Sequence, residues 1–237
     1  MDDLMEKGNA KFRRGDYQGA IADFTKMSKV RLTRILNWAG GMFKERDIGP
    51  PRLAFRLFCL AYRIFPWLGC KGAEWEFVLS RLPALCGGKV LVADIGGGLS
   101  LLPFEIARRG YGVTVYDQIE FKRRGRDVRY VRGDILGIGD GGYDVVLCIS
   151  VIEHIGLGMY GDAVFADGPM ALLKKMAGML KIGGILILTT PHLNYPIESD
   201  RKFTFAGIME MISKCGMKVV HSDLRWHQIM IIAERTE

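Results

Sequence analysis

The chain has 237 residues, of which 49% are hydrophobic and 25% are charged, so it has the composition of an ordinary globular protein with room for one catalytic domain and an appendage. No apolar stretch is long and charge-free enough to span a bilayer, and the first residues lack the pattern of a signal peptide. The five cysteines are scattered and show no C-x-x-C spacing, which favours a reducing, cytoplasmic location and argues against a zinc or other metal site.

The net charge of +7 is concentrated in the first third of the chain. Residues 1–72 contain 14 Lys and Arg against 7 Asp and Glu, an excess of +7, whereas residues 73–237 contain 19 of each. Two readings of this basic region stay open. It is either a solvated helical surface or a surface that attracts an acidic partner, a membrane or nucleic acid.

The first predicted element is a helical hairpin over residues 1–29. Residues 4–28 place small and aromatic side chains where a tetratricopeptide helix pair has them, with Gly15 and Asp16 at the turn. The stretch resembles one such repeat. Because no second copy follows and one repeat cannot bury its own face, we expect the hairpin to dock on its neighbours rather than to bind peptides.

Residues 30–85 are predicted to form a helical linker or cap. Within it, residues 52–65 form a strongly apolar helix whose arginines, Arg52, Arg56 and Arg63, fall on one stripe. One interpretation is that this helix packs on the next domain with its arginines outward. The other is that it lies in a membrane interface as a basic amphipathic helix, which would make the protein peripheral to the membrane.

From residue 86 to residue 237, predicted strands and helices alternate. The strands are expected at 89–95, 112–117, 128–131, 143–149, 185–190, 217–222 and 228–234, and the helices at 99–109, 170–180 and 203–215. This alternation indicates an α/β fold with a doubly wound, seven-stranded and mostly parallel sheet. The last two strands are joined by a short turn and are expected to form an antiparallel edge.

The first strand–helix–strand unit predicts a nucleoside-binding site. Strand 89–95 runs into Gly96, Gly97 and Gly98, and the next strand ends in Asp117. A backbone without Cβ atoms can approach a ligand closely, and an acidic side chain about 20 residues further on accepts hydrogen bonds from ribose hydroxyls. Because Leu101 stands where the dinucleotide fingerprint has its third glycine, the turn favours a ligand shorter than NAD.

Residues 86–237 resemble the class I S-adenosylmethionine-dependent methyltransferases, which have a Rossmann-like fold. The similarity rests on the glycine turn, on Asp117, and on Leu180-Lys181-x-Gly183-Gly184 before the fifth strand. Residues 150–162 are similar, more narrowly, to the methyltransferase-like group called domain of unknown function 268. The resemblance implies S-adenosyl-L-methionine as cofactor and the following cofactor-binding residues: Asp94, Gly96, Gly97, Gly98, Asp117, Gly133, Asp134, Ile135 and Ser150.

A methyl group on a sulfonium is already activated, so the protein has to hold the acceptor in line and exclude water. The candidate catalytic residues are His154 and Glu153, since both follow the strand at 143–149, where open α/β sheets place their ligands. The alternative is that this pair is structural and tethers the loop or lines the cofactor pocket. The candidate substrate residues are Tyr160 and Asp162, on a lid-like loop over 156–168, and His192 and Tyr195, after the fifth strand.

The sequence therefore predicts transfer of a methyl group to a small-molecule, glycan or lipid-linked acceptor. A nucleic-acid methyltransferase is a first alternative, suggested by the basic charge. It is not favoured, because Ser150-Val151-Ile152-Glu153 stands where amino-methylating enzymes of nucleic acids commonly have an Asn/Asp/Ser-Pro-Pro-aromatic motif. A non-enzymatic adaptor on a degenerate methyltransferase fold and a nicotinamide dehydrogenase are further alternatives. The sequence leaves the acceptor and the oligomeric state open.

Overall fold

The computed structural model describes residues 71–118, 127–138, 141–158, 162–194, 201–225 and 227–236. The predicted hairpin over 1–29 and the predicted basic helix over 52–65 lie outside these residues. The described helices are α5 (Lys71–Arg81), α6 (Leu102–Arg108), α7 (Gly168–Met179) and α8 (Phe205–Ser213). The described strands are β1 (Leu91–Ile95), β2 (Gly112–Asp117), β3 (Val128–Arg132), β4 (Tyr143–Ile149), β5 (Leu180–Pro191), β6 (Met217–Arg225) and β7 (Gln228–Arg235).

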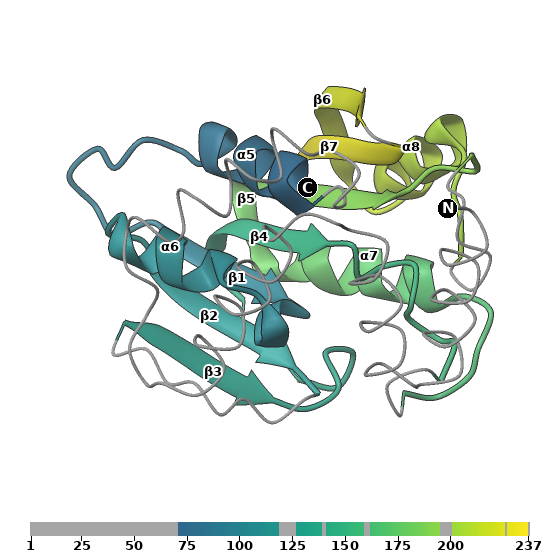
Figure 1. The fold of residues 1–237 in the computed structure, drawn as a ribbon, viewed down its shortest axis with the longest axis horizontal. Helices are drawn as coiled ribbons and strands as arrows, with labels where there is room; N and C mark the ends of the chain where they lie inside the picture. Colours follow the sequence, from purple (N-terminus) through teal and green to yellow (C-terminus); the bar gives the residue numbers. More distant parts are fainter. Residues whose placement is uncertain are drawn as a thin grey trace, which may run out of the picture. The chain divides into compact units, whose positions relative to one another are not determined.

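These strands form one seven-stranded sheet with the order β3-β2-β1-β4-β5-β7-β6 (Figure 1). Strands β1 to β5 run parallel to one another, and β7 runs antiparallel to both β5 and β6. The predicted doubly wound, mostly parallel sheet with an antiparallel edge is therefore confirmed. The chain leaves β1 toward β2 and β3 and returns on its other side at β4, which makes the carboxyl ends of β1 and β4 a topological switch point where such sheets bind ligands.

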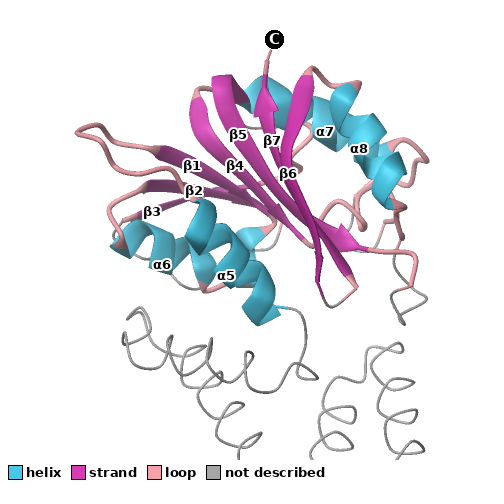
Figure 2. Cartoon of the chain, turned by 90° about the horizontal axis from the view of Figure 1, so that it is seen from above, coloured by secondary structure: helices cyan, strands magenta, loops and turns pink. Residues whose placement is uncertain are grey.

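Helices cover both faces of the sheet, as Figure 2 shows, with α5 and α6 on one face and α7 and α8 on the other. Each face carries its own apolar core, because strands buried on both sides have apolar residues at nearly every position. In β4, for example, five of the seven residues are buried. One core contains Trp75, Phe77, Leu102 and Ile106, and the other contains Leu172, Met176, Ile208 and Ile212.

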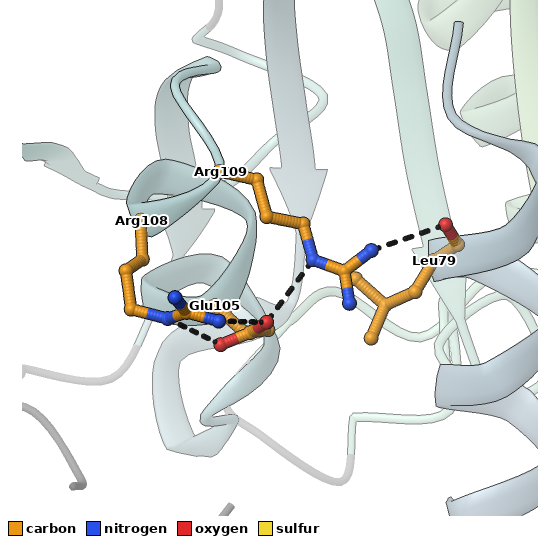
Figure 3. A network of polar contacts seen from close by, with 4 residues as sticks. All are labelled: Leu79, Glu105, Arg108 and Arg109. Atoms are coloured by element: carbon orange, nitrogen blue, oxygen red, sulfur yellow. Dashed lines mark hydrogen bonds and ion pairs between the residues drawn. The ribbon is translucent and has the colours of Figure 1, made fainter. Parts of the chain in front are cut away.

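A buried carboxylate in α6 binds two arginines, one of which also reaches α5 (Figure 3). Glu105 is 6% exposed and accepts hydrogen bonds from Nε and Nη2 of Arg108, at 2.8 and 2.6 Å, and from Nε of Arg109, at 3.0 Å. Arg109 also donates to the backbone oxygen of Leu79 in α5 at 3.4 Å. Burial opposes ionisation of Glu105, but the hydrogen bonds and charges of the two arginines outweigh it and lower its pKa.

The structure differs from several of the predicted elements. Strand β5 begins at Leu180, not at residue 185, because Leu180 pairs with Tyr143 before a register shift in β4. The helix predicted over 99–109 is a 3₁₀ turn, Gly97–Leu99, followed by α6. Helix α5 lies inside the predicted linker over 30–85 and has no counterpart of its own in the sequence prediction. None of the helices that the structure describes has the length and apolar character needed to cross a membrane.

Candidate active site

One pocket opens at the carboxyl ends of β1, β2 and β4 and beside the turn after β3. The pocket is lined by seven of the residues that the sequence predicted, namely Gly96, Asp117, Gly133, Ile135, Ser150, His154 and Asp162. Five others that the sequence did not single out also line it, namely Ile95, Tyr116, Gln118, Val151 and Ile155. The structure thus brings the glycine turn, the acid that ends β2 and the loop that follows β4 into one site.

The glycine turn holds the Asp117 carboxylate at the edge of the pocket. Gly96 adopts φ +70°, a left-handed conformation that favours glycine, and its N–H donates to the backbone oxygen of Tyr116 at 2.8 Å. The N–H of Gly98 donates to Oδ2 of Asp117 at 2.7 Å. A Cβ at Gly98 would overlap the Asp117 carboxylate. Any larger residue at Gly98 would therefore displace the acid that the sequence assigns to the ribose.

Four predicted cofactor residues shape turns and are not among the residues that line the pocket. Asp94 is 2% exposed and lies beneath the glycine turn, where a Cβ at Gly97 would overlap its carboxylate. Gly97 and Gly98 are buried within that turn. Asp134 is exposed, and its Oδ1 accepts a hydrogen bond from the N–H of Leu136 at 3.0 Å. Direct contact of these four residues with a cofactor stays a prediction.

The two candidate bases point to different places. His154 lines the pocket. Glu153 does not line it: this side chain is 1% exposed, and its Oε2 accepts a hydrogen bond from Oγ1 of Thr190 in β5 at 3.2 Å. This hydrogen bond links the loop after β4 to strand β5 and fits the structural alternative for Glu153, while the role of either residue in catalysis stays a prediction. His154 is the member of the pair that can meet a substrate.

The loop after β4 is folded back on itself beside the pocket. Oδ2 of Asp162 accepts a hydrogen bond from the N–H of Gly156 at 2.7 Å, and Arg201 donates to the backbone oxygen of Ile155 at 2.8 Å. Of the other predicted substrate residues, His192 lies outside the lining residues, and its backbone N–H donates to His227 at 2.9 Å. Tyr160 and Tyr195 lie outside the described residues.

Sequence reasoning missed a buried acid that α5 brings to the site. Glu74 is fully buried, and its Oε1 accepts hydrogen bonds from Oγ of Ser150 at 2.6 Å and from Oγ1 of Thr189 at 2.5 Å. A signal for it exists in the sequence, because Glu74 precedes the buried residues Phe77 and Val78 by three and four positions and so shares their helix face. A carboxylate on an apolar helix face requires polar partners in the fold.

No group of three or more His, Cys, Asp or Glu side chains within the described ranges could hold a metal ion.

Comparison with solved structures identifies the class of fold. The 1,6-didemethyltoxoflavin-N1-methyltransferase of Burkholderia thailandensis, solved with bound 1,6-didemethyltoxoflavin and S-adenosylhomocysteine, is similar with a TM-score of 0.58 and 18% identity over 76% of this chain and 86% of that chain. Magnesium protoporphyrin IX methyltransferase from Synechocystis, solved with bound S-adenosylhomocysteine, is similar with a TM-score of 0.53 and 16% identity over 84% of this chain and 94% of that chain. The described residues have the Rossmann-like fold of the class I S-adenosylmethionine-dependent methyltransferases.

Sequence comparison narrows the resemblance. A family model described as "Caenorhabditis protein of unknown function, DUF268" matches residues 140–220. The ubiquinone biosynthesis O-methyltransferase of Caulobacter vibrioides is 35% identical over 109 residues, which are 41% of this chain and 39% of that protein. The chain spans about half of the length, or less, of the curated relatives that it matches. These matches confirm the predicted resemblance to class I methyltransferases and to the domain-of-unknown-function-268 group.

Proposed function

We propose that the protein is an S-adenosyl-L-methionine-dependent methyltransferase that acts on a small-molecule, glycan or lipid-linked acceptor. The observation that carries the proposal is the pocket at the switch point of the sheet, which Gly96 and Asp117 line and where the Gly98 N–H holds the Asp117 carboxylate. Two findings support this cofactor. The similar proteins are named as methyltransferases, and two of the similar structures contain bound S-adenosylhomocysteine.

The residues that line the pocket fit this cofactor. Asp117 has the carboxylate that would accept hydrogen bonds from the two ribose hydroxyls, and Ile135, beyond β3, offers an apolar surface for the adenine. Position 96 requires glycine, because its φ is +70° and a Cβ there would overlap the side chain of Val151. When bound, S-adenosyl-L-methionine supplies an activated methyl group on a positively charged sulfur.

The chain's own part in the reaction falls to His154 and to the loop after β4. If the acceptor is a hydroxyl, its proton has to leave as the new carbon–oxygen bond forms, and a pocket-lining imidazole is suited to take it. The loop that carries Asp162 and is held by Arg201 would orient the acceptor and exclude water. Glu153 would act indirectly by holding the residue beside it in place.

Small-molecule acceptors have the most support. The similar proteins are named for ubiquinone biosynthesis, for 1,6-didemethyltoxoflavin and for magnesium protoporphyrin IX, which are small molecules. Residues 73–237 carry no net charge, whereas a nucleic-acid enzyme is expected to present a basic surface near its site. The basic excess of residues 1–72 keeps nucleic acid as the second candidate acceptor, and salt-sensitive RNA binding would favour it.

We also propose that residues 52–65 make peripheral contact with membranes. The support is the sequence pattern alone, three arginines on one stripe of an otherwise apolar predicted helix. Liposome flotation of the wild type against the triple variant Arg52→Glu, Arg56→Glu, Arg63→Glu tests it. We expect the variant to float less on vesicles that contain anionic lipid. Equal flotation of both proteins would dismiss the contact.

Calorimetric titration tests the proposed cofactor. We expect saturable binding of S-adenosyl-L-methionine and of S-adenosylhomocysteine, and no saturable binding of NAD. Binding of NAD alone would favour the dehydrogenase alternative, and binding of none of the three would favour the adaptor alternative, so either result would overturn the proposal. A His154→Ala variant separates binding from chemistry. We expect it to bind S-adenosyl-L-methionine and S-adenosylhomocysteine as the wild type does, and to lose methyl transfer when it is assayed with an identified acceptor.

A further inference from the structure

A buried hydrogen-bond network joins helix α5 to the pocket. Oε1 of Glu74 accepts hydrogen bonds from the hydroxyls of Ser150 at 2.6 Å and Thr189 at 2.5 Å. Ser150 lines the pocket at the carboxyl end of β4, whereas Glu74 is fully buried behind it. Glu74 thus reaches the pocket through Ser150 and not directly.

The backbone fixes Ser150 in one orientation. Its φ is +53°, a conformation that non-glycine residues seldom adopt and that the surroundings must therefore impose. Its N–H donates to Thr189, whose backbone oxygen is 3.0 Å away and whose Oγ1 is 3.1 Å away. With the side-chain hydrogen bond to Glu74, both the backbone and the hydroxyl of Ser150 are held by residues outside the pocket.

This arrangement decides the chemical character of the Ser150 hydroxyl. A serine hydroxyl has a single hydrogen, and here that hydrogen is given to the Glu74 carboxylate. The oxygen of Ser150 can then only accept hydrogen bonds from groups in the pocket. Donation to the Glu74 carboxylate also increases the electron density on the Ser150 oxygen, so this oxygen attracts positive charge.

The order of the strands indicates which part of the cofactor would lie near the Ser150 hydroxyl. Asp117 is the last residue of β2 and Ile135 follows β3, so on the proposed function the nucleoside would lie on one side of β1. Ser150 follows β4, on the other side of β1. On the proposed function, the part of S-adenosyl-L-methionine that extends past β1 toward Ser150 carries its positively charged sulfur and its amino group.

We propose that Glu74 is a positioning residue that turns Ser150 into a fixed hydrogen-bond acceptor, and that the pair makes the pocket prefer the positively charged methyl donor to its neutral product. The inference rests on the proposed function and adds a role for α5, which lies outside the glycine turn and the strand ends that define the fold. Such a preference would help the enzyme to release S-adenosylhomocysteine after each transfer.

The ratio of two dissociation constants tests the proposal. The variant Glu74→Gln keeps the shape of the side chain and removes its charge, and Glu76→Gln, at an exposed position of the same helix, is the matched control. We expect Glu74→Gln to bind S-adenosyl-L-methionine about tenfold more weakly and S-adenosylhomocysteine within about twofold of the wild type. The Glu76→Gln protein should match the wild type for both.

Retained binding of S-adenosylhomocysteine shows that the Glu74→Gln protein is folded. Equal weakening of both ligands, or no change in either, would overturn the proposal, because a merely structural residue would not alter the ratio. If Glu74→Gln fails to fold, Ser150→Ala decides: we expect the same loss of preference, and an unchanged ratio would refute the inference. A wild-type protein that binds neither ligand would instead refute the proposed function.

Discussion

Removing the Asp117 carboxylate should weaken cofactor binding more than any other single change to a pocket side chain. The carboxylate lines the pocket, and the Gly98 N–H, 2.7 Å from Oδ2, holds it in place. On the proposed function it accepts two ribose hydroxyls. Hydrogen bonds to a charged group contribute roughly 1.5–3 kcal/mol each, so Asp117→Ala should cost about 3 kcal/mol or more, which is roughly a hundredfold in Kd.

Isothermal titration with S-adenosylhomocysteine is the assay, because the product is not consumed during the measurement. Asp127→Ala is the control, since this exposed aspartate lies just before β3 and away from the residues that line the pocket. We expect the control to bind as the wild type does and Asp117→Asn to fall between the wild type and Asp117→Ala. A folded Asp117→Ala protein with an unchanged Kd would refute the assignment of this residue to the ribose.

Three further predictions concern single residues. Glu105→Gln should lower the free energy of unfolding at neutral pH by about 1 kcal/mol, measured by urea denaturation. The pKa of Glu105 is lowered in the folded protein, so the stabilisation by its carboxylate is present at pH values above the ordinary pKa of 4.5 and should fade as the pH drops below 4.5. A difference in unfolding free energy between Glu105→Gln and the wild type that does not change with pH would contradict this role of the carboxylate. Burial and, to a smaller extent, the charge of a nearby carboxylate raise the pKa of the fully buried Cys148 far above its ordinary range. Iodoacetamide should therefore modify the exposed Cys86 first and spare Cys148 until the protein unfolds. Equal rates of modification at the two cysteines, measured by peptide mass spectrometry, would contradict this. Gly98→Ala should weaken S-adenosylhomocysteine binding about tenfold or more, because its Cβ would overlap the Asp117 carboxylate. Gly178→Ala, where a Cβ meets nothing within 4 Å, should leave the binding unchanged. Equal affinities of the two variants would contradict the predicted effect of that overlap.

The sequence predicted the parts of the fold that depend on local pattern. The apolar run between turn residues predicts strand β4 at its observed bounds, Tyr143–Ile149, because such a run is typical of a buried strand. The glycine turn and Asp117 were also found, since the chemistry of a nucleotide site restricts both residue type and spacing. These residues line or shape the pocket that the structure contains.

Features that depend on tertiary contacts were not predictable in the same way. Glu153 and His154 are adjacent in an irregular loop, where no period tells which side chain faces the pocket and which faces β5. Glu74 lies 76 residues before Ser150, and only the docking of α5 on the sheet brings the two together. The start of β5 was missed because Gly183 and Gly184 resemble a helix stop, whereas pairing of Leu180 with Tyr143 extends the strand.

A crystal structure of the protein with S-adenosylhomocysteine tests the central claim most directly. We expect ligand density that runs from Ile135 and Asp117 past the glycine turn to Ser150, with both ribose hydroxyls within hydrogen-bond distance of the Asp117 carboxylate. A ligand bound elsewhere on the chain, or a ribose that makes no contact with Asp117, would contradict it.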